Sequence, residues 1–414
     1  MRIMAETAAV VILGGGVAGF SVCYYLAKEG IPSVVIEMDS IASKASGKSC
    51  GLILPPEDAS IFFPSYIPPW STMPVRSATA WDPLISLNAE SWSRFQELPL
   101  ELKEGSGIDI QWGESPALYC AMSPEDEQLS KSMIAEANSR RLGITWLGAD
   151  EVRALDNTVT NEVRGAILVS EYQVEPYRYT LALAQAAENL GASIRNGEAV
   201  GFDHNERRVN SVILSTDSKI SAEIIVVAMG PWSSQAGSWL GAKIPLKPIL
   251  AQALKVQVPE PLPMYKTNFT SPAGSKWSGQ IVSVLPKFDR SVLLGYTEES
   301  PETWDDTRTE TWRETPTEEM RDFLITGAIR LRPIMSTSTL VEARAAILGY
   351  SPDEWPILGR LPGWDNVYTA TGMGTLGITL SPAVGRVITD FIVGGGRAER
   401  AAEQMKSFEP DRFL

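Results

Sequence analysis

The chain contains 414 residues, 44% of them hydrophobic, and its formal net charge is −14. Its length predicts two or three domain-sized units with a large buried core. The negative net charge and the lack of a polybasic run argue against a nucleic-acid-binding protein, which needs clustered Lys and Arg side chains to contact phosphates. The three cysteines have no spacing pattern, and the sequence shows neither a signal peptide nor an apolar run as long as a membrane-spanning helix. These features predict a cytoplasmic protein without a transmembrane segment.

The single histidine of the chain, His204, lies in a polar stretch that predicts a solvated turn. Catalytic triads, Cys–His pairs and His-rich metal sites all require an imidazole held in a pocket. The composition therefore predicts no metal site, and it predicts chemistry that comes mainly from a bound cofactor.

The first predicted unit is a strand, a glycine turn, a helix and a second strand. The apolar run 8–13 is typical of a strand buried in a parallel sheet, and the turn 14–19 follows it with the spacing G-x-G-x-x-G. Residues 17–29 predict a helix that Gly30 stops, and residues 33–36 predict the next strand. Such a unit is the context that dinucleotide binding requires.

The glycines and the acid of this unit have separate expected roles. Gly14 would make the tight turn, Gly16 would let a pyrophosphate approach the backbone, and Gly19 would let helix and strand pack closely. Glu37, at the end of the second strand, is placed to accept hydrogen bonds from a ribose 2′-hydroxyl. An acid at this position disfavours a 2′-phosphate, but it does not separate FAD from NAD.

Two segments after the acid could also serve the site. Residues 43–51 are small and hydroxylated, which suits either a cofactor-wrapping segment or an ordinary loop. Residues 61–81 are rich in aromatic residues and prolines, and such a segment should pack as a lid or as an interface.

The middle of the chain completes one sheet and begins another. A helix is predicted from Pro176 to Gly191, followed by strands over 192–200 and 224–229 that close a parallel sheet. From 247 to about 343 the pattern predicts alternating strands, such as 281–285 and 292–296, without the helix–strand alternation of a Rossmann unit. This stretch predicts a second domain around an antiparallel or mixed sheet.

A second turn with the spacing G-x-G-x-x-G, at 372–377, follows a predicted strand at 367–371. A helix is predicted from Ser381 to about Val393, and no acid-bearing strand comes after it, so we expect no second dinucleotide site. The backbone N–H groups of this turn and the dipole of its helix would favour negative charge. A reduced flavin develops such charge at its N1–C2=O edge, so the second turn could address the redox end of the cofactor.

These motifs make the chain resemble the D-amino acid oxidase superfamily of FAD-dependent oxidoreductases, most closely the glycine oxidase, sarcosine oxidase and D-amino acid dehydrogenase branches. The resemblance rests on ordered blocks over most of the chain: 14–19 with Glu37, 45–47, 51–52, 174–178, 228–233, 294–297, 351–353, 356–359, 372–377 and 379–383.

The resemblance implies an α/β fold in two parts, with FAD bound in an extended pose. A discontinuous, Rossmann-like FAD-binding domain would comprise residues 1–60, 145–240 and 344–414. A smaller α+β substrate domain, built on a mainly antiparallel sheet that covers the flavin, would comprise residues 61–144 and 241–343.

The motifs and the resemblance together assign a cofactor site. By the family pattern, Val200 would hold the adenine end of FAD through its backbone, and residues 374–377 would hold the pyrimidine end of the isoalloxazine. The expected cofactor-binding residues are Gly14, Gly16, Val17, Ala18, Gly19, Glu37, Met38, Lys44, Ala45, Ser46, Lys48, Ser49, Cys50, Gly51, Leu52, Val200, Ala228, Gly230, Trp232, Gly349, Gly372, Met373, Gly374, Thr375, Leu376, Gly377, Ile378 and Thr379.

The chain departs from the family pattern where relatives hold a substrate carboxylate. Members that oxidise amino acids carry an Arg five residues before Asp353, and Leu348 stands there. The glycine oxidase branch has a second Arg in its last glycine motif, and Thr375 stands there. Arg344 could still reach a carboxylate, or it could be a solvated residue at a strand end. Without such a cation the substrate could be an amine, an ester, an amide or a bulky secondary amine.

Three further positions bear on the flavin. Lys48 stands where sarcosine and dimethylglycine dehydrogenases attach flavin through a His, so FAD is expected to bind non-covalently. Cys50 lies beside it, where a thioether is conceivable, but we expect a buried and inert thiol. Met373 replaces the usual His of the last motif and leaves an apolar contact.

The resemblance implies oxidation of a C–N bond in an amine or amino acid, of the D-amino acid, glycine or N-alkyl amino acid type. Hydride would pass to flavin N5, and the imine would then hydrolyse. Oxygen, or a quinone or other electron carrier, would accept the electrons, and a homo-oligomer is possible. No catalytic residue is assigned; the candidates for substrate contact are Arg344, Tyr296, Leu348 and Met373.

Two alternatives stay open at the level of the sequence. One is an FAD-dependent 2-hydroxy acid or alcohol dehydrogenase, which the lack of a histidine base near the second turn disfavours. The other is a flavoprotein subunit of an electron-transfer complex.

Overall fold

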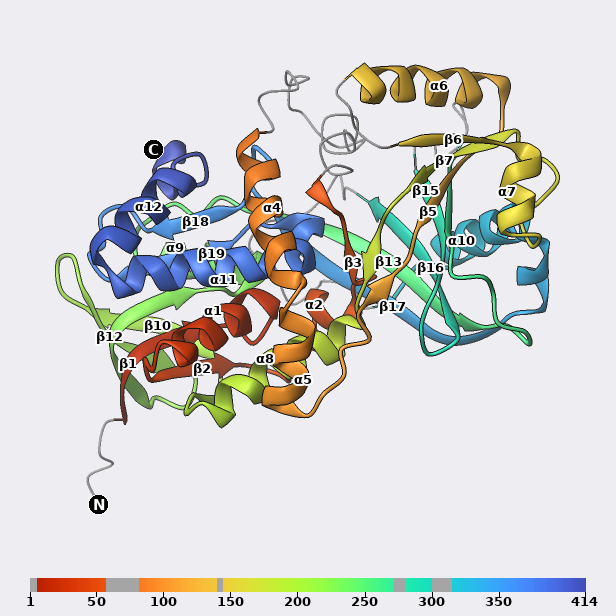
Figure 1. The fold of residues 1–414 in the computed structure, drawn as a ribbon. Coiled ribbons are helices and arrows are strands. Elements are labelled where there is room, and N and C mark those ends of the chain that lie inside the picture. The colour runs from red at the N-terminus through yellow and green to blue at the C-terminus, as the bar shows by residue number, and fades with distance from the viewer. Residues whose placement is uncertain (1–5, 57–81, 140–143, 272–279, 300–314) are drawn as a thin grey trace.

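The computed structural model of the chain describes residues 6–56, 82–139, 144–271, 280–299 and 315–414. Two domains lie side by side in Figure 1, each built around one large sheet. We call them the parallel-sheet domain and the antiparallel-sheet domain. The aromatic and proline-rich segment 61–81, expected to be a lid or an interface, lies outside the described residues.

The parallel-sheet domain contains an eight-stranded sheet. Five of its strands, β1, β2, β9, β12 and β19, run parallel to their neighbours in this group, and β10, β11 and β18 are antiparallel additions. The strands are β1 (Glu6–Leu13), β2 (Ser33–Glu37), β9 (Ser193–Asn196), β10 (Ala199–His204), β11 (Val209–Leu214), β12 (Lys219–Val227), β18 (Ile357–Arg360) and β19 (Val367–Thr371).

Helices cover both faces of this sheet because its central strands are apolar on both sides. The larger core lies under α1 (Val17–Lys28), α4 (Asp82–Phe95), α5 (Leu98–Ser106), α8 (Pro176–Asn189), α11 (Gly377–Val393) and α12 (Gly395–Met405). The opposite face packs on α9 (Ser233–Trp239), and the short helices α2 (Ala45–Lys48), η2 (Gly230–Trp232), η5 (Gly374–Leu376) and η6 (Pro410–Phe413) also belong to this domain.

The antiparallel-sheet domain contains a second eight-stranded sheet, in the order β17-β13-β16-β15-β14-β5-β7-β6. All its neighbouring strands are antiparallel except β14 and β5. The strands are β5 (Ala117–Ala121), β6 (Thr145–Gly148), β7 (Gly165–Val169), β13 (Lys247–Gln257), β14 (Lys266–Thr270), β15 (Ile281–Pro286), β16 (Ser291–Glu299) and β17 (Thr339–Tyr350).

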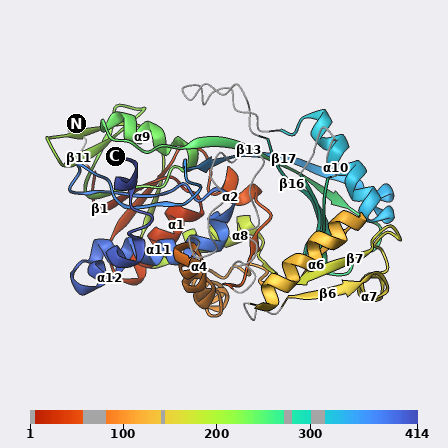
Figure 2. The same ribbon diagram turned by 90° about the horizontal axis from the view of Figure 1, so that it is seen from above.

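The two faces of this second sheet have different coverings. One face packs on α10 (Glu318–Leu331) and α7 (Ala149–Leu155), near η4 (Pro333–Thr337). On the other face, α6 (Pro124–Ser139) packs over one end, and Figure 2 shows α6 and α10 on either side of the strands. A small sheet of β3 (Leu52–Ile53), β8 (Tyr172–Gln173) and β4 (Gly113–Glu114) lies between the two domains.

The predicted fold class is confirmed: a discontinuous Rossmann-like α/β domain is joined to a domain on a mainly antiparallel sheet. Some segments are distributed differently from the predicted boundaries. Residues 82–106 form α4 and α5 in the core of the parallel-sheet domain, whereas β6 and β7, over 145–169, pair in the second sheet. Strand β17 also stays in the second sheet up to Tyr350, beyond the predicted boundary at 344. These placements depend on pairing between distant segments, which local patterns do not encode.

Helix α11 begins at Gly377, four residues before the predicted start at Ser381, and Pro382 lies inside it. Pro382 has no N–H to donate to the Ile378 carbonyl. The Ser381 hydroxyl donates to that carbonyl instead, at 2.9 Å, so the helix continues through the proline.

Among the described residues, one helical stretch, Gly374–Val393, is long and apolar enough to cross a membrane. Within its most apolar window 61% is buried inside the protein, as in a core helix. Length and composition are therefore weak evidence for a membrane span here.

Candidate active site

A cavity of about 1190 Å³ lies between the two domains. Its walls come from both glycine turns, from the segment around α2, and from the face of the antiparallel sheet opposite α10. Residues that are far apart in the sequence therefore share one chamber, between the two halves seen from above in Figure 2.

The first turn leaves no room for side chains at two of its glycines. Gly14 has φ +106°, and a Cβ there would overlap the carbonyl oxygen of Ala228. A Cβ at Gly19 would overlap the carbonyl oxygen of Gly14. The turn and the close packing that the motif predicts thus occur at the expected positions.

Helix α1 begins after Gly16, and its N-terminus faces the cavity. Its first turn contains no acidic residue, so the positive end of the helix dipole has no acidic side chain there to neutralise it. The N–H of Val17 donates to the hydroxyl of Ser46 at 2.9 Å, which brings α2 against the turn. Backbone amides and a hydroxyl at a helix N-terminus form a suitable site for an anion such as a pyrophosphate.

Glu37 lies at the end of β2, beside the first turn. Its carboxylate accepts hydrogen bonds from the N–H of Gly15 at 2.6 Å and of Asp39 at 2.9 Å. These bonds orient the carboxylate at the cavity wall, where the sequence predicts contact with a ribose.

The second turn has a different geometry at the same spacing. Gly372 and Gly374 have φ +73° and +48°, and a Cβ at Gly374 would lie 2.6 Å from the ring of Tyr350. The 3-10 turn η5 then leads into α11, whose first turn also contains no acidic residue. A Cβ at Gly377 would lie 3.9 Å from Val17 Cγ1, so the N-termini of α11 and α1 are neighbours.

The residues present therefore fit FAD. Two helix N-termini without acidic first turns face one elongated chamber, and glycines keep its wall open at both turns. α1 would hold the pyrophosphate, and α11 the pyrimidine end of the flavin. Within the described residues, no group of three or more His, Cys, Asp or Glu side chains could hold a metal ion.

Nearly all the expected cofactor-binding residues line this cavity. Among the described residues the exceptions are Gly19, which packs against Gly14 beneath the turn, and Val200, which is exposed. Next to Val200, residues 197–199 do line the cavity.

The four candidates for substrate contact have different surroundings. Arg344 lines the cavity, but it forms an ion pair with Glu342 at 2.8 Å, and its buried Nε has no hydrogen-bond partner among the described residues. Leu348 and Met373 line the apolar part of the wall near the second turn. Tyr296 lies in β16, and its side chain is outside the described part of the structure.

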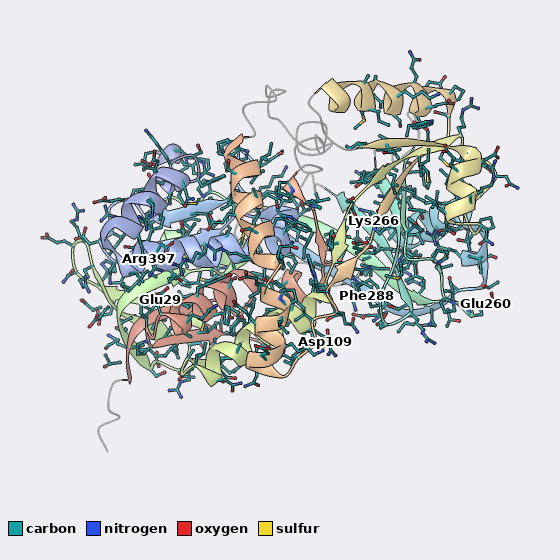
Figure 3. The ribbon with its side chains drawn as sticks, in the orientation of Figure 1. Glu29, Asp109, Glu260, Lys266, Phe288 and Arg397 are labelled. Carbon is teal, nitrogen blue, oxygen red and sulfur yellow. The ribbon has the colours of Figure 1, made fainter. Side chains whose placement is uncertain are left out.

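The cavity also contains a buried polar cluster that the sequence did not indicate. Lys266 of β14 forms an ion pair with Glu171, and the Tyr119 hydroxyl donates to Glu171 at 2.9 Å. Lys266 Nζ lies 3.5 Å from the Tyr119 hydroxyl, and all three residues line the cavity. In Figure 3 Lys266 lies near the junction of the two domains. The alternating strand Lys266–Thr270 is typical of a half-exposed sheet, so its pattern cannot distinguish a solvent face from a cavity face.

A second lysine, which is half-buried, links the antiparallel sheet to the cavity wall. Lys287 donates to the carbonyl oxygens of Cys50 at 2.9 Å and Val174 at 3.2 Å. Burial lowers the pKa of Lys287 from 10.5 to about 8. Burial raises the pKa of the Cys120 thiol, at another part of the wall, to about 12, which keeps that thiol protonated.

Comparison with known proteins accounts for this arrangement. The family model described as FAD dependent oxidoreductase (DAO) matches residues 9–391. The chain belongs to this family. The chain is also similar to the hydrogen cyanide synthase subunit HcnC of Pseudomonas aeruginosa, 26% identical over 94% of this chain and 93% of the relative. The glycine oxidase of Geobacillus kaustophilus is 24% identical over 92% of each chain.

Solved structures show the same fold. The crystal structure of glycine oxidase from Bacillus cereus superposes with a TM-score of 0.78, at 23% identity, and covers 94% of this chain and 95% of that one. Iminodiacetate oxidase from Chelativorans sp. BNC1 gives a TM-score of 0.77 at 21% identity and covers 97% and 98% of the two chains. The protein is thus an FAD-dependent oxidoreductase with the fold of these flavoproteins.

Proposed function

We propose that the protein oxidises a C–N bond in an amine or amino acid, giving an imine that hydrolyses. The observation that carries the proposal is the single cavity that joins both glycine turns to the face of the antiparallel sheet. FAD, when bound there, supplies the hydride acceptor. The names of the relatives support this class of substrate, because several are glycine oxidases.

The chain's own residues would position the substrate and exclude water. Leu348, Met373 and Ile347 make the wall near the second turn apolar, which favours a neutral amine over an ammonium. The amides at the start of α11 would stabilise negative charge that develops at the second turn.

A C–N oxidation suits a cavity without a histidine base. His204 lies at the exposed end of β10, 4.8 Å from the ring of Trp364, and does not line the cavity. Oxidation of an alcohol generally needs a base for the hydroxyl proton, whereas a neutral amine already carries a lone pair that assists hydride loss.

FAD would be held without a covalent bond, and oxygen or an electron carrier in the cytoplasm would accept the electrons. Lys48 stands at the family's attachment position, and its Nζ donates to the Ala345 carbonyl at 3.2 Å. Release of all flavin upon denaturation with acid would support this part of the proposal, and retention on the precipitated chain would contradict it.

The experiment is anaerobic reduction of the yellow holoenzyme by a panel of substrates. We expect primary or secondary amines to bleach the flavin, and matched 2-hydroxy acids to leave it oxidised. Bleaching by hydroxy acids alone would overturn the proposal. As a fold control, Gly16→Val should purify without FAD, because added bulk at Gly16 lies 3.0 Å from Ser46 Oγ and occupies the approach to α1.

A further inference from the structure

One continuous row of residues crosses the cavity-side face of the antiparallel sheet. Its members are register partners on six successive strands, and all line the cavity. In strand order from β17 to β5 they are Arg344, Ala253, Gly295, Ser283, Asn268 and Tyr119.

The row has small side chains in the middle and larger polar side chains at both ends. Ala253, Gly295 and Ser283 have small side chains, so they leave space over the centre of the sheet. Arg344 stands at one end, and Asn268 and Tyr119 stand at the other. Asn268 is four strand spacings, or roughly 19 Å, from Arg344.

At the Asn268 end, part of the hydrogen-bonding capacity is unused among the residues that the structure describes. Asn268 is 2% exposed, lines the cavity, and its Oδ1 accepts no hydrogen bond from the described residues. Lys266, two residues earlier on the same face, is 4% exposed. Its partners among the described residues, Glu171 and Tyr119, account for two of its three N–H donors. A buried acceptor and a buried donor thus lie roughly 7 Å apart along β14 at their Cα atoms.

The strand that carries them is held firmly from its other face. The guanidinium of Arg332 donates to Thr267 Oγ1 at 2.9 Å and pairs with Asp156 at 2.6 Å, all three being buried. Thr267 lies between Lys266 and Asn268, so this contact fixes the backbone from which both side chains project.

We propose that Lys266 and Asn268 form a recognition site for a carboxamide group of the amine substrate. The carboxamide oxygen would accept from Lys266 Nζ, and its N–H would donate to Asn268 Oδ1. This inference rests on the proposed function for the identity of the substrate as an amine.

A carboxylate matches the same groups poorly. It has no N–H for Asn268, and it would approach the buried carboxylate of Glu171, which already neutralises Lys266. The proposal also agrees with Leu348 and Thr375 at the two positions where amino acid oxidising relatives carry arginines.

The test measures binding to the FAD-loaded enzyme by titration calorimetry with two matched pairs of probes, acetamide against acetate and benzamide against benzoate. We expect each amide to bind at least tenfold more tightly than its acid. In Asn268→Leu the amide affinity should fall about tenfold and the acid affinity should hold. Asn157→Leu, at an exposed position of the same domain, is the matched control and should change neither.

Acids that bind as tightly as the amides would overturn the proposal, as would an unchanged ratio in Asn268→Leu. If that variant does not fold, the ratio in the unmodified enzyme still decides. The binding measurement is separate from catalysis. If the amides bind more tightly than the acids but no amine reduces the flavin, the recognition site is supported and the proposed oxidation is contradicted. Reduction by amines without a preference for amides would do the reverse.

Discussion

The two glycine turns share one spacing, but they depend on different glycines. In the first turn, Gly14 and Gly19 are required because backbone oxygens occupy the space of a side chain. In the second, glycine is required at 372 and 374 because the backbone φ is positive, and at 374 also because the ring of Tyr350 occupies the space of a side chain. Gly377 has room for a Cβ. The close contacts of Gly14 come from Ala228 in the same domain, whereas Gly374 contacts Tyr350 of β17 in the antiparallel sheet. The same motif therefore indicates a helix N-terminus in both places, but its surroundings decide which glycine can be replaced.

The test with the largest expected effect replaces the last glycine of each motif, Gly19 or Gly377, with alanine. Gly19→Ala should lose FAD and destabilise the fold by about 3 kcal/mol or more, because its Cβ would overlap the Gly14 carbonyl. Gly377→Ala should change stability by less than about 1 kcal/mol, because its nearest neighbour is 3.9 Å away. Urea unfolding and flavin content of the purified variants measure both effects. Equal losses in the two variants would contradict the comparison.

Gly374→Ala addresses the second turn alone. The added Cβ would lie 2.6 Å from Tyr350 and at φ +48°, so we expect a cost of about 2 kcal/mol. Because α1 is untouched, the variant should keep stoichiometric FAD while its flavin absorbance spectrum shifts and its reduction by an amine slows. Stopped-flow absorbance and flavin content are the measurements. A variant that purifies without FAD would show that the second turn shares the task of the first.

Lys287 links the antiparallel sheet to the wall between the turns, and its stability contribution should depend on pH. Its folded-state pKa of about 8 lies below the ordinary 10.5, so the unfolded chain binds more protons between these values. Raising the pH from 8 to 10.5 should therefore stabilise the unmodified protein relative to Lys287→Met by about 2 kcal/mol. Urea unfolding of both proteins across this range measures the change. Parallel pH profiles would show that Lys287 loses no buried charge there.

The smallest effect concerns the C-terminal end of α1, where Glu29 contacts α11 and α12. Glu29 ends α1 and accepts from Arg397 at 2.8 and 2.9 Å and from Arg386 of α11 at 2.9 Å, and Figure 3 shows Glu29 and Arg397 together. The hydrogen bonds from Arg397 lower the pKa of Glu29 from 4.5 to about 2. Because the group is near solvent, Glu29→Gln should cost only about 1 kcal/mol at pH 7.

This cost has a defined pH window. The stabilisation is present above pH 4.5 and should decrease as the pH falls from 4.5 towards 2, because the unfolded chain takes up its proton near 4.5 whereas folded Glu29 stays charged until about 2. Chemical denaturation at pH 7 and pH 3 measures the change, with Glu206→Gln at an exposed loop as the control. A cost that is the same at both pH values would show that packing, not charge, holds the two helices.

Local chemistry was sufficient to predict the first turn, the acid of β2 and the position of the second turn. It was not sufficient for the start of α11, where a hydroxyl of Ser381 replaces the N–H that Pro382 lacks. Nor did it assign β6 and β7 to the second sheet, because their partners in pairing lie far along the chain. The position of Lys266 in the cavity could not be predicted for a related reason. A charged residue in an alternating strand fits a strand face exposed to water and a strand face that lines a cavity equally well.

The sequence by itself predicted a dinucleotide site and the Rossmann-like frame, because a glycine turn, its helix and a terminal acid are contiguous and their geometry is local. The choice of FAD came from the resemblance of ordered blocks over most of the chain. The resemblance also predicted, without the structure, that Leu348 and Thr375 stand where the family pattern has arginines. Only the tertiary structure decided which polar groups line the cavity. Lys266, Glu171, Tyr119 and Asn268 come from distant segments, and strand pairing together with the burial of one sheet face brings them to the same wall. Burial of Asn268 leaves its Oδ1 with no hydrogen-bond partner among the described residues, a condition that the local sequence does not encode.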